Sequence, residues 1–130
     1  MRAVLDSNIF VSAFLFGGNP ARILQCAEER TFTLLTSPPL RDEVEEVLAR
    51  KFSWPRNLIR TACDPLWELS VSVSPQFLVD RCSDPDDNRV LECAAEGKAN
   101  FIVTGDNHLL TIKIYRKIKI VNPSVFLKLL

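Results

Sequence analysis

The sequence predicts an α/β domain built on a parallel sheet, and three observations lead to this fold class. Short apolar runs that suit buried strands alternate with longer segments that have helical periodicity. Two of the apolar runs end directly on aspartate, as strands do where a parallel sheet meets a ligand. The length of 130 residues suits one domain, residues 1–130, with a core of its own.

The first half of the chain opens on a short apolar run that ends at polar residues, which is typical of a buried strand. Gly17-Gly18 should stop the apolar helix that follows, and Asn19-Pro20 has the form of an N-cap followed by proline at the first helical position. The expected elements are a strand over 2–6, a short helix over 9–16, a helix from Asn19-Pro20 to about Arg30, and a strand over 31–36.

The second half begins with Ser37-Pro38, which predicts another helix start. Its apolar stripe is Leu40, Val44, Val47 and Leu48, at helical spacing. Gly97 should end a later helix. The further expected elements are a helix over 58–69, a strand or loop over 70–73, a helix over 85–96, strands over 101–104 and 118–121, and a terminal helix over 124–130.

Composition excludes several classes of protein. The chain carries 16 basic and 16 acidic residues, so it lacks the basic excess of many nucleic-acid binders. No apolar stretch is long enough to span a membrane or resembles a signal peptide. The four cysteines are widely spaced, with no Cys-x-x-Cys pair, which favours reduced thiols in a cytoplasmic protein.

Asp6 and Asp106 each follow a predicted strand, so they should meet at the edge of the sheet where ligands bind. Both also stand in good turn sequences, and a turn alone would explain either one. Asn8 could hold the Asp6 carboxylate by a hydrogen bond, and Thr104 could bring a hydroxyl to the same cluster. His108 is interpreted as an incidental loop or surface residue.

Two further groups of acids belong to predicted helices. Glu43 falls at the edge of an apolar stripe, so it can reach inward, although a boundary residue directed to water would look the same. Asp84 suits a helix cap, and acids at positions 86 and 87 favour the helix dipole. Capping of the helix does not require acids at both position 86 and position 87. Carboxylates gathered in one cleft repel one another, so the pattern predicts a divalent-metal site.

Four motifs together resemble the PIN domain family. They are Val4-Leu-Asp-Ser-Asn-Ile-Phe-Val-Ser-Ala, Ser37-Pro-Pro-Leu-Arg-Asp-Glu-Val-Glu-Glu-Val-Leu, Asp84-Pro-Asp-Asp-Asn and Ile102-Val-Thr-Gly-Asp-Asn-His-Leu-Leu. The similarity extends over nearly the whole chain. It is greatest to the bacterial and archaeal group of toxin components of toxin–antitoxin systems. The resemblance implies a three-layer α/β/α sandwich with a central parallel sheet.

The resemblance also implies a site and an activity. Asp6, Glu43, Asp87 and Asp106 would be the catalytic and metal-binding residues; Asn8, Ser37, Asp84 and Thr104 would support them. The family's chemistry is hydrolysis of RNA by an endoribonuclease, and hard oxygen ligands favour Mg²⁺ or Mn²⁺. An RNA substrate, a cognate antitoxin and a homodimer are the partners that the family implies, with no membrane.

Basic residues near the end of the Glu43 helix and near the C-terminus are candidates for RNA contacts, namely Arg50, Lys51, Lys113 and Lys117. A solvated surface explains them equally well. Three other functions stay open. A phosphoaspartyl phosphatase would need a second acid where Asn8 stands, and a receiver domain would need a strand-end lysine. A non-catalytic RNA-binding or protein-interaction module on a PIN fold would keep the same ligands.

Overall fold

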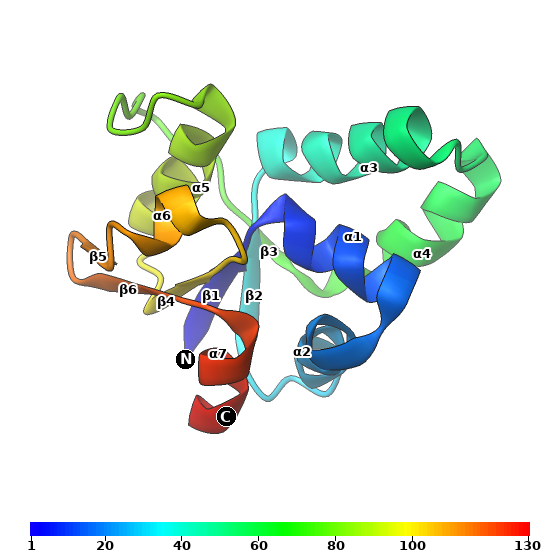
Figure 1. Ribbon diagram of the computed structural model, residues 1–130, viewed down its shortest axis with the longest axis horizontal. Coiled ribbons are helices and arrows are strands. Elements are labelled where there is room, and N and C mark those ends of the chain that lie inside the picture. Colours follow the sequence, from blue (N-terminus) through cyan, green and yellow to red (C-terminus); the bar gives the residue numbers. More distant parts are fainter.

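A six-stranded sheet forms the centre of the molecule in a computed structural model that describes residues 1–130 (Figure 1). The strands are β1 (Arg2–Leu5), β2 (Thr33–Thr36), β3 (Val71–Ser72), β4 (Phe101–Val103), β5 (Ile114–Tyr115) and β6 (Ile118–Val121). Their order in the sheet is β3-β2-β1-β4-β6-β5. All neighbouring pairs are parallel except β5 with β6.

Seven helices accompany the strands; six lie between strands and α7 follows the last one. They are α1 (Ser7–Phe16), α2 (Gly18–Glu28), α3 (Pro38–Phe52), α4 (Arg56–Leu69), α5 (Pro85–Glu96), α6 (Asn107–Leu110) and α7 (Pro123–Leu129). Figure 1 shows α5 and α6 on one side of the sheet and α1, α2 and α7 on the other. The predicted fold class, an α/β sandwich of three layers, is therefore confirmed.

The alternation of side chains along the central strands produces two separate cores. In β1, Ala3 and Leu5 pack into the core beneath α1, α2 and α7, whereas Val4 packs into the core beneath α5 and α6. Because successive residues of a strand point to opposite faces, a strand between two helical layers must be apolar on both. This requirement explains why the predicted strands are continuous apolar runs rather than alternating ones.

Strand register brings the ends of β1 and β4 to the same level. Leu5 is paired with Val103, and the Asp6 amide donates to the Val103 carbonyl at 2.9 Å. Asp6 and Thr104 are thus the first residues beyond two neighbouring strands, at one edge of the sheet. The topology therefore places polar residues where parallel α/β sheets bind their ligands.

Three expectations need correction. The sheet is not wholly parallel, because β5 pairs antiparallel with β6. Neither β5 nor the short helix α6 was predicted, since segments of two and four residues carry no measurable periodicity. Helix α2 begins at Gly18, not after a cap at Asn19, because Gly17 and Gly18 both adopt positive φ and turn the chain earlier.

A polar contact fixes α3 against α4 and so steadies the helix that carries Glu43. The Trp67 indole donates to Glu45 at 2.8 Å, and Arg60 pairs with the same carboxylate. These hydrogen bonds lower the pKa of Glu45 although its partial burial acts in the opposite direction. Glu45 therefore has a structural role on α3 that differs from the role of Glu43.

None of the seven helices is both long enough and apolar enough to cross a lipid bilayer.

Replacement of Leu5 by alanine should destabilise the protein strongly, because this side chain is 1% exposed and belongs to the strand that carries Asp6. Removal of a buried leucine costs about 2–5 kcal/mol in unfolding free energy. Leu78→Ala is the matched control, since Leu78 is 85% exposed and its loss should cost less than about 0.5 kcal/mol. Urea unfolding of both variants measures the difference, and equal costs would contradict the assigned core.

Candidate active site

Asp6 is buried at the sheet edge and held by three donors. Its Oδ1 accepts from the Ser7 amide at 2.8 Å, so Asp6 also caps α1. Its Oδ2 accepts from the Thr104 hydroxyl at 2.7 Å and from the Asn8 side chain at 3.2 Å. Donors on both oxygens fix the orientation of the carboxylate and leave lone pairs for a further ligand.

Thr104 connects the two strand-end aspartates. While its hydroxyl donates to Asp6, the same oxygen accepts from the Asp106 amide at 3.0 Å. Asp106 in turn caps α6 by accepting from the His108 amide at 3.1 Å. The side-chain Oδ1 of Asn8 also accepts from the Gly105 amide at 3.4 Å. Hydrogen bonds thus tie the loop after β4 to the loop after β1.

The N-terminus of α5 brings more acids to the same edge. Asp84 caps the helix by accepting from the Asp86 amide at 2.9 Å, as its sequence position indicates. Asp87 is only 7% exposed, which is unusual for an aspartate in the first turn of a helix. Capping therefore accounts for Asp84 and does not account for the burial of Asp87.

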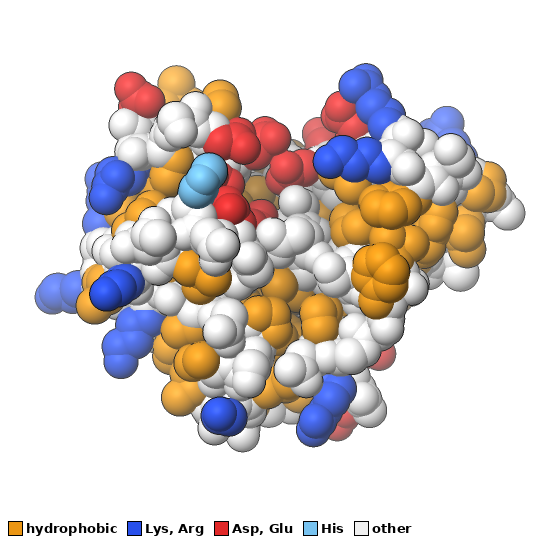
Figure 2. All heavy atoms as spheres, in the orientation of Figure 1, with side chains coloured by type: hydrophobic (Ala, Val, Ile, Leu, Met, Phe, Trp, Pro, Cys, Tyr) orange, Lys and Arg blue, Asp and Glu red, His pale blue; other side chains and the backbone are white.

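Asp87, Asp106 and His108 form one compact cluster. One potential ligand atom from each residue lies within 4.8 Å of the other two. Figure 2 shows the acidic side chains gathered in a depression, with the chain's one histidine at its margin. His108 was expected to be incidental. The structure instead places it beside two acids, because the short, unpredicted helix α6 turns it back towards α5.

Glu43 approaches the cluster from α3 and faces a different acid. The charges of Asp86 and Asp6 act on its carboxylate, and the Ser7 side chain lies beside it. Glu43 and Asp86 also line a shared hollow with Arg50 and Lys51. From the sequence, Asp86 was expected only to stabilise the start of the helix. The presence of two acids after the cap was the signal that one of them could also face Glu43.

Burial and mutual repulsion raise the pKa of three carboxyl groups at this edge. Burial raises the pKa of Asp6, although the Thr104 and Ser7 hydrogen bonds oppose the shift. Burial and then the charges of Asp106 and Asp6 raise the pKa of Asp87 to about 6. Burial and then Asp86 raise the pKa of Glu43 to about 7. Near neutral pH, the carboxyl groups at this edge therefore keep part of their negative charge, and no group of the protein fully neutralises it.

The donor set fits a divalent cation. Asp87 and Asp106 offer hard carboxylate oxygens, and His108 adds a nitrogen at ligand spacing. Asp6 and Asp106 both contribute to the repulsion at Asp87, so a cation at this position would relieve all three acids. A hollow of ≈ 360 Å³ beside Asp87 and His108 leaves room for a further ligand.

The remaining predicted site residues differ in position. Ser37 is buried, and its hydroxyl has no hydrogen-bond partner. It lies beside the Cys93 thiol, whose pKa burial raises to about 12 against the effect of this hydroxyl. No hydrogen bond connects the Ser37 hydroxyl to the acids, so its supporting role in the cluster stays a prediction. Asn8 and Thr104 do contact Asp6.

The four predicted basic residues fall in three places. Arg50 and Lys51 line the hollow of Glu43. The Lys113 carbonyl accepts from the Ile120 amide, which puts Lys113 towards the end of β6 that is near the acids. Lys117 precedes β6 and lies at the opposite edge of the sheet. Proximity in sequence grouped Lys113 with Lys117, whereas the β5–β6 hairpin separates them.

The acids should make the metal-free protein less stable as pH rises. A carboxyl whose pKa is raised from 3.8 to about 6, as for Asp87, binds a proton in the folded state when the unfolded chain has released it. Its contribution to stability is present at low pH and is lost as pH rises through the folded pKa. Asp87→Asn should therefore gain stability relative to wild type as pH rises from about 4 to about 6, and the gain should stay constant above about pH 6.

Thermal unfolding of both proteins in EDTA across this pH range measures the effect. Glu68→Gln serves as the control, because Glu68 is exposed and remote from the cluster. A difference between wild type and Asp87→Asn that stays constant from about pH 4 to about pH 6 would contradict the assigned repulsion.

Comparison with known proteins identifies the family and supports the fold. The chain is 30% identical to the uncharacterized protein MJ1680 of Methanocaldococcus jannaschii over 141 residues, covering 98% of this chain and 90% of that protein. Its fold is similar to a chain in the crystal structure of VapBC2 from Rickettsia felis bound to a DNA fragment from their promoter. That likeness has a TM-score of 0.65 at 13% identity and covers 94% of this chain and 98% of the other. The PIN domain model matches residues 2–108, so the chain belongs to the PIN domain family.

Proposed function

We propose that this PIN domain, residues 1–130, is a metal-dependent endoribonuclease and the toxin component of a toxin–antitoxin pair. The observation that carries the proposal is the convergence of two buried acids and one half-buried acid from separate segments. Asp6 follows β1, Asp87 lies in the first turn of α5, and Asp106 follows β4. Asp6 and Asp106 are close enough to Asp87 to raise its pKa. PIN domains are typically nucleases, and such a cluster is what metal-dependent hydrolysis of a phosphodiester requires of the protein.

Asp87, Asp106 and His108 would hold the ion, Mg²⁺ or Mn²⁺, and Asp6 would complete its surroundings. When bound, the ion supplies Lewis-acid stabilisation of the attacked phosphate and lowers the pKa of attacking water. The Thr104 hydroxyl keeps Asp6 facing the site. Asn8 holds the same carboxylate and, through the Gly105 amide, the loop that carries Asp106. These groups preorganise the acids before substrate arrives.

Glu43 is the best placed group to accept a proton from water. Its pKa of about 7 lies near physiological pH, where a general base works most effectively. Asp86 and Ser7 at its side orient the carboxylate. Arg50 and Lys51 line the same hollow and could pair with RNA phosphates next to the reacting one. Lys113, near the same edge, is a second candidate for a backbone contact.

The proposed biological setting follows from the family and from the thiols. One structural neighbour is a chain from a VapBC2 structure, which supports a cognate antitoxin for this chain, and a homodimer is a further expectation. All four cysteines are free, which favours a reducing compartment such as the cytoplasm. A non-catalytic RNA-binding or protein-interaction module is the alternative, and it predicts binding of RNA without turnover.

Asp106→Asn should abolish metal-dependent cleavage of RNA without unfolding the protein. Loss of a group that only orients a metal ligand reduces activity by up to about 100-fold. Loss of a side chain that binds the metal directly should reduce the rate of cleavage further. The assay follows a labelled RNA with Mn²⁺ or Mg²⁺ and, as control, Glu68→Gln. Undiminished cleavage by Asp106→Asn would contradict the assignment, and absence of metal-dependent cleavage by wild type would favour the binding module.

His108→Gln should weaken Mn²⁺ binding more than Mg²⁺ binding. An imidazole nitrogen suits transition metals, whereas Mg²⁺ prefers oxygen ligands and keeps much of its water. Pulsed electron paramagnetic resonance of Mn²⁺ bound to wild type should detect coupling to an imidazole nitrogen, and His108→Gln should lose it. Mn²⁺ bound to wild type without nitrogen coupling would exclude His108 as a ligand and leave the acids as the only candidates.

A further inference from the structure

A hollow of ≈ 800 Å³ lies at the edge of the sheet opposite the acids. Its lining comes from the start of β1, the turn after α5 and the β5–β6 hairpin. Four cations surround it, Lys98, Arg116, Lys117 and Lys119, and no acidic residue lines it. In a chain with net charge zero, this is a marked local excess of positive charge.

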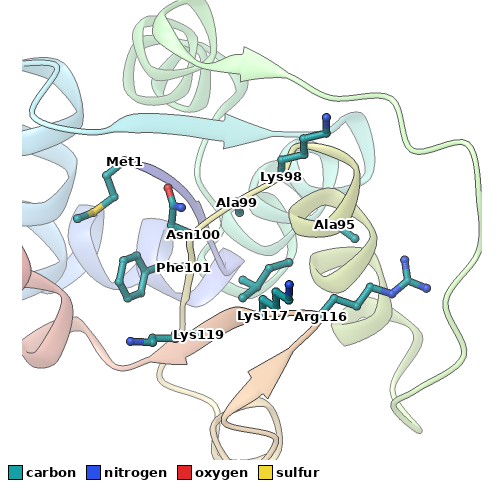
Figure 3. A pocket seen from close by; sticks show the side chains of 10 residues that line it. Met1, Ala95, Lys98, Ala99, Asn100, Phe101, Arg116, Lys117 and Lys119 are labelled. Carbon is teal, nitrogen blue, oxygen red and sulfur yellow. The ribbon is translucent and has the colours of Figure 1, made fainter.

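The cations are available to a ligand. None of the four forms an ion pair, although basic residues elsewhere do, such as Arg60 and Arg89. All four are exposed. Figure 3 shows their side chains on different sides of the hollow, with Phe101 and Ala95 among them. Lys98, Arg116 and Lys117 adopt positive φ, a conformation that the tight turns of the backbone impose there.

The floor of the hollow adds a second kind of contact. Phe101 is half-buried, and its ring packs at one side against Phe126, with centroids 5.8 Å apart. At the rim, Arg116 is held over the rings of Phe77 and Tyr115, which lie outside the hollow, with its guanidinium carbon 5.3 and 5.4 Å from their centroids. Cations at the rim and apolar groups between them suit the phosphates and bases of a single nucleic-acid strand.

We propose that this hollow is a second binding site for single-stranded RNA, which holds the strand beyond the point of cleavage. The inference rests on the proposed ribonuclease function for the choice of RNA. From Phe101 to Asp106 the chain advances at most about 17 Å, so a long RNA could follow the surface from one edge to the other. A short RNA bound at the acids would not reach the hollow.

The first test measures binding without turnover. Fluorescence anisotropy with a labelled oligouridylate of about 20 nucleotides in EDTA excludes cleavage. Lys117→Glu/Lys119→Glu should weaken binding about 10-fold and reduce the slope of log affinity against log salt by about 1.4, about 0.7 for each lost phosphate contact. Arg22→Glu/Arg56→Glu makes the same charge change at exposed residues outside the hollow and should retain most of the affinity. Thermal unfolding checks that both variants are folded.

The second test compares substrates of two lengths in Mn²⁺. Lys117→Glu/Lys119→Glu should raise KM for the long RNA and leave cleavage of a tetranucleotide unchanged. Unchanged affinity for the long RNA, or an equal loss in the control variant, would overturn the second site. Failure of wild type to cleave either RNA would instead defeat the ribonuclease proposal, and the anisotropy would still decide whether the hollow binds RNA.

Discussion

The hydrogen bond from Thr104 to Asp6 is the contact on which the rest of the site depends. It joins residues 98 positions apart in the sequence and has a length of 2.7 Å in a buried setting. It exists because β1 and β4 are neighbours in register, so their ends reach one level of the sheet. The two cores on either side fix that register, since a shift by one residue would exchange the faces of Ala3, Val4 and Leu5.

The fold is therefore arranged to concentrate negative charge. Stable packing, helix capping and strand pairing each bring an acid to the same edge. No lysine or arginine forms an ion pair with Asp6, Asp87 or Asp106, and the exposed His108 lies beside two of them. Burial raises the pKa of Asp6 and Asp87, which shows that the folded state carries an electrostatic cost here. Such a cost is typical of functional sites, where a ligand relieves it. Basic side chains lie instead at the other edge of the sheet, around Lys98 and Lys117.

Sequence patterns predicted most of the fold, because helices such as α3 and α5 carry long periodic stripes with clear caps. They also identified Asp6 and Asp106, since strand ends are visible as the ends of apolar runs. Segments without periodicity were the ones missed, namely α6 and β5. The position of His108 beside Asp87 and Asp106 was missed for the same reason, because it depends on α6. Whether Asp86 or Asp87 faces Glu43 depends on how α3 crosses α5, which no local pattern records.

The most direct test of the central claim is anomalous diffraction from crystals of the protein grown with Mn²⁺. The account predicts a single strong peak between Asp87, Asp106 and His108, at about 2.0–2.3 Å from their ligand atoms. It also predicts that Thr104 still donates to Asp6 in that structure. A peak elsewhere, or no peak at this edge while the acids keep their positions, would contradict the claim that these carboxylates converge to bind a cation.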